Sequence, residues 1–206
     1  MPHLRNRVVS ALALAAFATF TPSGPASAQT HYYARGGVQY TSTLLEDDIF
    51  DPIEVRGGIG PTLTAGASRP LGRQAHAGLE ATLAMTPLEA RETGVTRDLG
   101  SVTTLSALAN LAGRITGPLG WRAGLGVVTY LGGSDAGFFQ DGHPTRLLVG
   151  GGVDYRRAAF TGWDLMISAR YDHHRFTTET LDRRGFANAH GVHRVGLSVG
   201  LSRGAR

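Results

Sequence analysis

Cysteine and lysine are both absent from the 206-residue sequence. The lack of cysteine excludes a small domain held together by disulfides. It also excludes a lipoprotein anchor, which is attached to an N-terminal cysteine. All 20 basic residues are arginines, and they are spread along the chain rather than clustered. We therefore expect no nucleic-acid partner.

Long apolar runs are also missing beyond residue 28. No later segment approaches the roughly 20 apolar residues that a membrane-spanning helix needs. A helical membrane protein is therefore excluded, and if this chain enters a membrane it must do so as strands.

The first 28 residues have the pattern of a secretory signal peptide. Arg5 and Arg7 precede a mostly apolar run over residues 8–20, and Ala26-Ser27-Ala28 supplies small residues at the first and third positions before a cut. A buried core helix would leave that small-residue ending unexplained. We expect cleavage before Gln29, which leaves residues 29–206 as one mature domain.

The most regular pattern in the remaining chain is an alternation of apolar with small or polar residues. In HRVGLSVGLS, residues 193–202, the odd positions are almost all apolar and the even positions are polar or glycine. Successive side chains of a strand leave opposite faces, so this period of two predicts a strand with one apolar face. Similar alternation predicts seven more strands, near residues 32–40, 55–67, 76–85, 101–115, 121–131, 146–156 and 163–176.

In the second predicted strand the alternation places Val55, Ile59 and Leu63 on the apolar face and Arg56 on the polar face.

The connections between the predicted strands alternate between long and short. Eight antiparallel strands with both termini at the short-turn end produce this order, as in bacterial outer-membrane barrels. We therefore predict an all-β fold, a closed eight-stranded antiparallel up-and-down transmembrane barrel. The long connections fall near residues 43–54, 88–100, 132–144 and 177–190, and the short ones are RPLGRQ, TGPLG and AAFTGW.

The polar face of these strands combines glycine with charged residues. A soluble barrel of the lipocalin type would turn its apolar face inward, whereas glycine alternating with arginine suits the narrow lumen of an eight-stranded membrane barrel. Charges in such a lumen are costly unless acids and arginines at similar heights pair. The residues that we assign to lumen ion pairs are Arg35, Glu80, Arg114, Arg122, Arg146, Asp154, Arg170, Asp172 and Arg194.

Counting residues up from the short turns gives approximate heights for these charges. Glu80 is expected to reach Arg114 or Arg35, and Asp154 to lie near Arg122. Asp172 is expected between Arg146 and Arg194. These pairs would form a plug that narrows the lumen.

Four aromatic residues form a predicted girdle close to the short turns. Trp121 and Trp163 directly follow such turns on the apolar face, and Tyr32 and Tyr155 fall at the same height. Amphipathic rings at one height are typical of a membrane interface.

The stretch YDHHRF, residues 171–176, contains adjacent histidines that would suit a metal site. Strand parity sends His173 outward and His174 inward, so the two rings cannot share one ion unless a local bulge intervenes. The acidic stretch LEDDIFDPIE, residues 45–54, lacks the glycine-centred pattern of a calcium loop and is interpreted as a solvated loop. We predict no metal and no cofactor.

With this architecture, the chain resembles the small eight-stranded outer-membrane barrels, the OmpA-like transmembrane domain and the opacity-type surface antigens. The local match is to the barrel-assembly signal of that family, formed here by Arg194, Gly196, Val199 and Leu201. Family members usually end on an aromatic residue, whereas this chain continues as SRGAR. The resemblance implies a monomer in the bacterial outer membrane, in contact with lipid and lipopolysaccharide. It also implies that the barrel-assembly machinery and periplasmic chaperones act during biogenesis.

Some small barrels of this kind deacylate or transfer lipid A chains. The deacylase pattern requires a histidine and a serine two residues apart, and no His-x-Ser occurs in this sequence. We therefore predict no catalytic residues and a structural, envelope-integrity or surface-interaction role through four external loops. A narrow gated solute pore is the alternative, followed by a lipid A-modifying enzyme.

Overall fold

The computed structural model describes residues 30–47, 53–72, 74–92, 94–131, 144–177 and 190–204. The predicted signal peptide, residues 1–28, lies outside these residues. The described chain contains no helix that could cross a membrane. Its strands are β1 (His31–Thr41), β2 (Thr43–Asp47), β3 (Ile53–Gly57), β4 (Ile59–Leu71), β5 (Ala75–Glu92), β6 (Val95–Thr116), β7 (Leu119–Leu131), β8 (Thr145–Phe160), β9 (Trp163–Phe176) and β10 (His190–Gly204).

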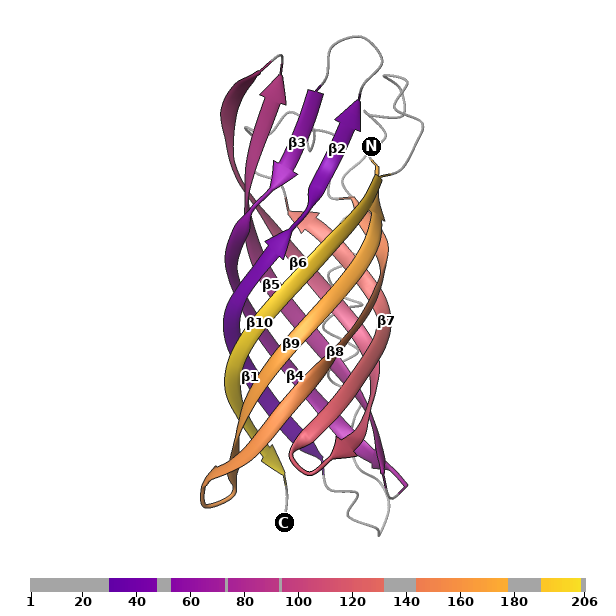
Figure 1. Ribbon diagram of the computed structural model, residues 1–206. Coiled ribbons are helices and arrows are strands. Elements are labelled where there is room, and N and C mark those ends of the chain that lie inside the picture. The colour runs from indigo at the N-terminus through magenta and orange to yellow at the C-terminus, as the bar shows by residue number, and fades with distance from the viewer. Residues whose placement is uncertain are drawn as a thin grey trace, which may run out of the picture.

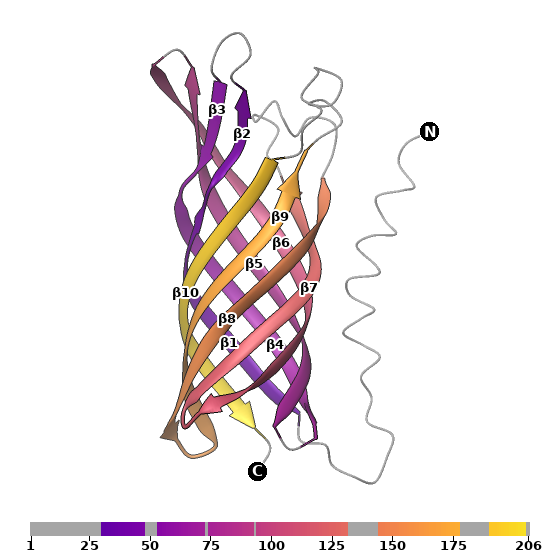
Figure 2. The same ribbon diagram turned by 45° about the vertical axis from the view of Figure 1, so that its right-hand side comes forward.

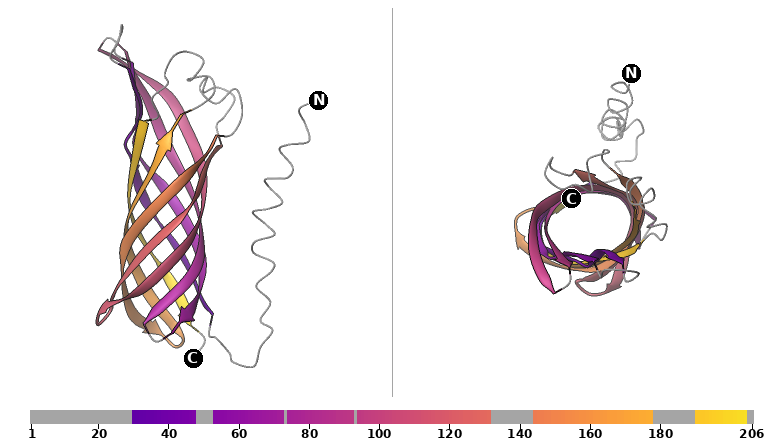
Figure 3. Two further views of the ribbon diagram at one scale, coloured as in Figure 1. Left: turned by 90° about the vertical axis from the view of Figure 1, so that its right-hand side faces the viewer. Right: turned by 90° about the horizontal axis from the view of Figure 1, so that it is seen from above.

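Eight of these strands close into a ring. Each strand from β4 to β10 pairs antiparallel with the next along the chain, and β1 pairs with both β4 and β10. Seen from above, the ribbons form a complete circle of tilted strands (Figure 3). The closed eight-stranded antiparallel barrel predicted from the alternation is confirmed.

The two ends of the barrel differ. The short turns between β4 and β5, β6 and β7, and β8 and β9 lie together at one end, here called the turn end (Figure 1). The opposite end, here called the loop end, carries the connections 47–53, 92–95, 131–145 and 176–190. The predicted alternation of short and long connections is therefore confirmed, but two of the long connections are shorter than expected. Residues 43–47 and 53–54 of the predicted loop 43–54 belong to β2 and β3, and β5 and β6 continue into a tight hairpin.

The two additional strands, β2 and β3, extend the barrel wall at the loop end. They continue β1 and β4 beyond short breaks at Ser42 and Gly58, and with the upper parts of β5 and β6 they rise above the rest of the wall (Figures 1 and 2). β3 pairs with both β2 and β5.

The break at Gly58 reverses the face that β3 presents. Val55 is only 3% exposed and packs inward, whereas Arg56 points out. The prediction that Val55 shares the outer face with Ile59 and Leu63 was therefore wrong. The register of β5 against its partners also shifts between Pro87 and Glu89, and a one-residue slip moves every following side chain to the other face.

Within the barrel the apolar face points outward. On β10, for example, Val195, Leu197 and Val199 are 50%, 59% and 53% exposed, while the intervening residues point into the ring. A water-soluble protein buries such residues, so this surface is built for contact with an apolar medium.

Candidate functional site in the barrel lumen

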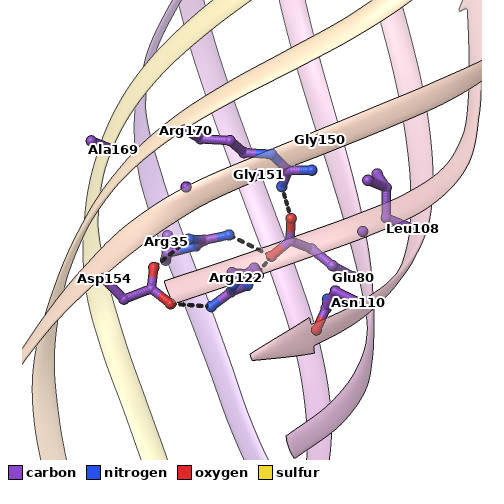
Figure 4. Close-up of a pocket in the computed structure, with 12 residues that line it drawn as sticks. Arg35, Glu80, Leu108, Asn110, Arg122, Gly150, Gly151, Asp154, Ala169 and Arg170 are labelled. Atoms are coloured by element: carbon purple, nitrogen blue, oxygen red, sulfur yellow. Dashed lines mark hydrogen bonds and ion pairs between the residues drawn. The ribbon is translucent and has the colours of Figure 1, made fainter. Parts of the chain in front are cut away.

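The lumen near the turn end is filled by charged side chains from five strands. Glu80 on β5 lies at their centre, with Oε2 2.5 Å from Nη2 of Arg35 on β1. The same oxygen contacts Arg122 on β7, and the other oxygen contacts Arg170 on β9. Figure 4 shows these guanidinium groups converging on the one carboxylate.

A second carboxylate, Asp154 on β8, connects to the same arginines. Its Oδ2 lies 2.7 Å from Nη2 of Arg122, and its Oδ1 lies 3.6 Å from Nη1 of Arg35. Ser168 on β9 donates to Oδ1 at 2.6 Å and accepts a hydrogen bond from Arg35 at 2.7 Å. The carboxylates and arginines therefore form one connected network rather than separate pairs.

Tyr33 on β1 completes the network, although it was not among the predicted site residues. Its hydroxyl donates to Glu80 at 2.8 Å and accepts from Nη1 of Arg122 at 2.6 Å. The guanidinium carbons of Arg35 and Arg122 lie 5.2 and 4.7 Å from its ring centroid, within cation–π range. The ring fits because its partner on β4 is Gly66, where a Cβ atom would lie 2.3 Å from Cζ of Tyr33.

Burial gives these ion pairs their importance for stability. The side chain of Glu80 is 0% exposed, and those of Arg35 and Asp154 are both 3% exposed. Isolated charges at this depth would each cost several kcal/mol. Asp172 adds a third carboxylate by accepting from Nε of Arg170 at 2.7 Å. Arg156 of β8 also approaches Asp154, with Nη2 3.6 Å from Oδ2, so four arginines face three carboxylates.

Two predicted pairings differ from the structure. Asp172 lies opposite Arg194 in the register of β9 and β10, beside that arginine as predicted, but its ion pair is with Arg170, two residues earlier on the same strand and face. Of the two partners expected for Glu80, Arg35 contacts it, whereas Arg114 is exposed and pairs in register with Gly120 at the turn end. The residue of β6 opposite Glu80 is Leu108, so Arg114 sits six positions closer to the turn, about 20 Å along the strand.

The remaining predicted lumen arginines lie nearer the loop end. Arg146 donates to the carbonyl oxygens of Thr145 and Thr177. Arg194 donates to Oγ1 of Thr104 at 3.3 Å, and its guanidinium lies 5.5 Å from the ring centroid of Tyr130. Neither arginine belongs to the network around Glu80.

Toward the loop end the lumen contains a cluster of buried apolar side chains, beside buried polar residues such as Arg194 and His174. Leu108, Val128, Leu148 and Val192 point inward from four strands and are at most 2% exposed. The hydroxyl of Tyr130 lies 2.5 Å from Nε2 of His174 within this layer. The apolar layer, defined as the cluster of buried residues on this side, also contains Leu44, Leu45, Val55, Leu88, Val102, Tyr130 and Phe176. Sequence reasoning missed it, although apolar residues at inward-facing positions such as Leu108 and Leu148 were a readable signal.

Little space is left between the charged side chains. The cavity lined by Arg35, Glu80, Arg122 and Asp154 has a volume of about 10 Å³. This is roughly the space that one water molecule requires. Arg170 also lines this cavity, and most of the other lining residues are small or uncharged, among them Asn110 and Gly150 (Figure 4).

The four residues of the predicted aromatic girdle all lie close to the turn end. Tyr32 is 61% exposed, and Trp121 and Tyr155 are each 38% exposed on the outer face. Trp163 is half-buried and stacks near Phe160, with ring centroids 6.0 Å apart.

The adjacent histidines diverge as strand parity requires. His174 is buried in the lumen, whereas His173 lies on the outer face beside His193 of β10. The described residues contain no group of three or more His, Cys, Asp or Glu side chains arranged to hold a metal ion.

The segment matching the assembly signal lies entirely on β10. Arg194 and Gly196 are on the lumen side, and Val199 and Leu201 are on the outer side. Part of the acidic stretch is described as well: Glu46 lies 3.8 Å from His190, and Glu54 pairs with Arg56 at 2.6 Å. Its members Asp48 and Asp51 lie outside the described residues.

No protein-family model and no curated protein sequence matches this chain. Solved structures do match it. Neisserial surface protein A is 16% identical, with a TM-score of 0.51, over 84% of this chain and 96% of that chain. The outer membrane protein AlkL, solved in lipid bilayers, is 14% identical, with a TM-score of 0.50, over 91% of this chain and 96% of that chain. OprG from Pseudomonas aeruginosa is 12% identical, with a TM-score of 0.49, over 85% of this chain and 96% of that chain.

The match to the first two structures covers nearly their whole length at low identity. Such a likeness establishes the fold, and the chain has the architecture of the small outer-membrane β-barrels. The predicted resemblance to this structural class is confirmed.

Proposed function

We propose that the chain is a closed outer-membrane barrel with a structural and surface-interaction role. The observation that carries this proposal is the network around Glu80, which joins strands from all sides of the lumen and leaves a cavity of about 10 Å³. A solute pore needs an open path, whereas this lumen is filled by a charged network and then by the apolar layer.

The outer surface supports the location. Exposed leucine, valine and isoleucine side chains cover the barrel wall, and the ring of strands leaves no unpaired backbone edge in that wall, as hydrocarbon requires. Tyr32, Trp121 and Tyr155 then mark the interface at the turn end, which would face the periplasm. In this placement the wall contacts lipid, and its loop end contacts lipopolysaccharide and the exterior.

The surface that would meet partners is the wall extension at the loop end. β2 and β3, with the tips of β5 and β6, rise above the ring and carry charges of both signs, such as Glu54, Arg56, Arg91 and Glu92. A rigid sheet that projects beyond the membrane suits contact with another surface better than it suits transport. We propose no enzymatic activity. Biogenesis through periplasmic chaperones and the barrel-assembly machinery, and a monomeric state, belong to the same proposal.

Planar-bilayer recording tests this role directly. Purified wild-type protein inserted into a bilayer should give no steady conductance above the background of the membrane. Steady ohmic conductance of the wild type would overturn the closed-barrel proposal and favour the narrow pore. Lipid A profiling of a deletion strain tests the enzyme alternative, because a change in acyl chains would be its signature.

A further inference from the structure

Two histidines meet on the outer face of the barrel near the loop end. His173 of β9 and His193 of β10 are direct register partners, so their side chains leave the sheet side by side. Their ring centroids lie 4.8 Å apart, with an angle of 38° between the ring planes. This pair belongs neither to the lumen network nor to the aromatic girdle.

His193 is held in place through both its ring and its backbone. The Tyr171 hydroxyl lies 2.6 Å from Nδ1 of His193. This hydrogen bond occupies Nδ1 and leaves Nε2 for another partner. On the backbone side, the amide of His193 donates to Oγ of Ser42 at 2.9 Å, and its carbonyl accepts from the amide of Ser42 at 2.9 Å. Metal-binding histidines are commonly fixed in this way through the nitrogen that does not bind the metal.

The ring of His173 has bonding capacity left over. Its Nδ1 is buried and has no hydrogen-bond partner. The position next to both rings is Gly191, where a Cβ atom would lie 3.1 Å from Cε1 of His173 and 3.8 Å from Nε2 of His193. Cε1 of His173 lies between the two nitrogens of its ring, so the nitrogen-bearing edge of this ring and Nε2 of His193 both face the Cα of Gly191.

We propose that His173 and His193 form a two-histidine site for a divalent late transition-metal ion, with Zn²⁺ as the natural probe. Imidazole nitrogen is a preferred ligand of zinc, copper and nickel, whereas calcium and magnesium prefer oxygen. The described residues offer no third side chain of the usual ligand types at this point. The other coordination positions therefore belong to water or to an oxygen of the surrounding headgroups. Tyr171 is a positioning residue in this site.

The proposal depends only on the fold, so it stands or falls separately from the closed-barrel role. The test is calorimetric titration of the folded full-length protein in detergent micelles with ZnCl₂. His173→Phe and His193→Phe keep an aromatic ring in each place but remove its nitrogens. Each should weaken Zn²⁺ binding at least tenfold. Tyr171→Phe should weaken it about 10- to 100-fold while thermal stability stays unchanged, because only the orientation of His193 is lost.

The matched control is a second histidine ring pair among the described residues, His31 and His76, whose centroids lie 5.2 Å apart at the turn end. His76→Phe should leave Zn²⁺ binding as in the wild type. A band that shifts on boiling shows that each variant is folded. The proposal is overturned if the wild type does not bind Zn²⁺. It is equally overturned if His173→Phe or His193→Phe binds it as tightly as the wild type does.

Discussion

Arg35 and Glu80 meet 2.5 Å apart in the lumen, although their strands β1 and β5 are separated in the ring by β4. Backbone pairing joins only neighbouring strands, so this contact is a side-chain link across the interior. Arg122 and Arg170 extend the link to the far wall of the barrel. The network therefore ties together strands that the sheet itself does not connect, and several of the following expectations concern its loss.

Glu80→Gln should destabilise the folded barrel strongly. The change leaves the buried guanidinium groups of Arg35 and Arg122 and the partly buried one of Arg170 facing a neutral amide. Removing one partner of a buried ion pair costs about 3–5 kcal/mol. Urea unfolding in lipid vesicles, followed by tryptophan fluorescence, measures the loss. Glu54→Gln is the control, because it removes a carboxylate from the ion pair with Arg56 outside the lumen and should change stability little. Similar losses for both variants would contradict the central role of Glu80.

Gly66→Ala should disturb the network without touching any charge. The added methyl group would lie 2.3 Å from Cζ of Tyr33, so the ring must move and its bonds to Glu80 and Arg122 weaken. Overpacking of this kind costs about 1–3 kcal/mol, measurable in the same unfolding assay. Gly36→Ala is matched to it, since a methyl group there meets only the Thr62 carbonyl oxygen at 3.9 Å. The prediction fails if the two variants are equally stable.

Leu197→Arg should impair folding into lipid far more than Ser198→Arg. Leu197 is 59% exposed on the outer wall, where an arginine near the bilayer midplane costs about 2–4 kcal/mol. Ser198 points into the lumen, where the main obstacle is steric, because its Cβ already fills the space beside Gly37, its register partner on β1. The folded fraction after dilution from urea into vesicles, read from the gel shift, decides between them. Equal folded fractions would show that the outer wall does not contact lipid.

Opening the lumen should require changes in both the charged network around Glu80 and the apolar layer. Leu148 of the apolar layer lies six positions closer to the loop end on β8 than Asp154 of the charged network, so the two barriers lie in series. Glu80→Ala alone and Leu148→Ala alone should therefore conduct little in a planar bilayer. The double variant should give clearly higher conductance than either. If Glu80→Ala alone opens a steady channel, the apolar layer is not a barrier.

The strands and their outward faces could be predicted from sequence because period-two alternation depends on the backbone alone. In β10, for example, Val195, Leu197 and Val199 had to share one face whatever their neighbours were. The closed ring also followed, since alternating short and long connections leave few other arrangements. The reversal at Val55 could not be foreseen, because it results from the break at Gly58 and the slip in β5.

The partners within the lumen were less predictable than its lining. Heights counted from the turns ignore the tilt and stagger of the strands. Arg114 was therefore predicted to lie level with Glu80, whereas it lies about 20 Å along the strand from the residue opposite Glu80. Pairs on one strand needed no such estimate, yet the i, i+2 pair of Arg170 and Asp172 was overlooked. Tyr33 faced the lumen by parity, but its role depends on Gly66 of the next strand, which alternation alone does not align with it.

The seam between β1 and β10 has a consequence for how the barrel forms. Its first register pair joins His31 to Gly204, near opposite ends of the described residues. The other pairs of the ring join strands that follow one another, apart from β1 and β4, which are separated only by the short strands β2 and β3. Hairpins of successive strands can form locally and early, but the seam has to wait until its most distant partners are both present. Contacts of such long sequence separation slow folding. Until they form, β1 and β10 each present an open edge that hydrocarbon does not tolerate. Closing the ring and entering the membrane should therefore be a single cooperative event, with the seam as its last and slowest step.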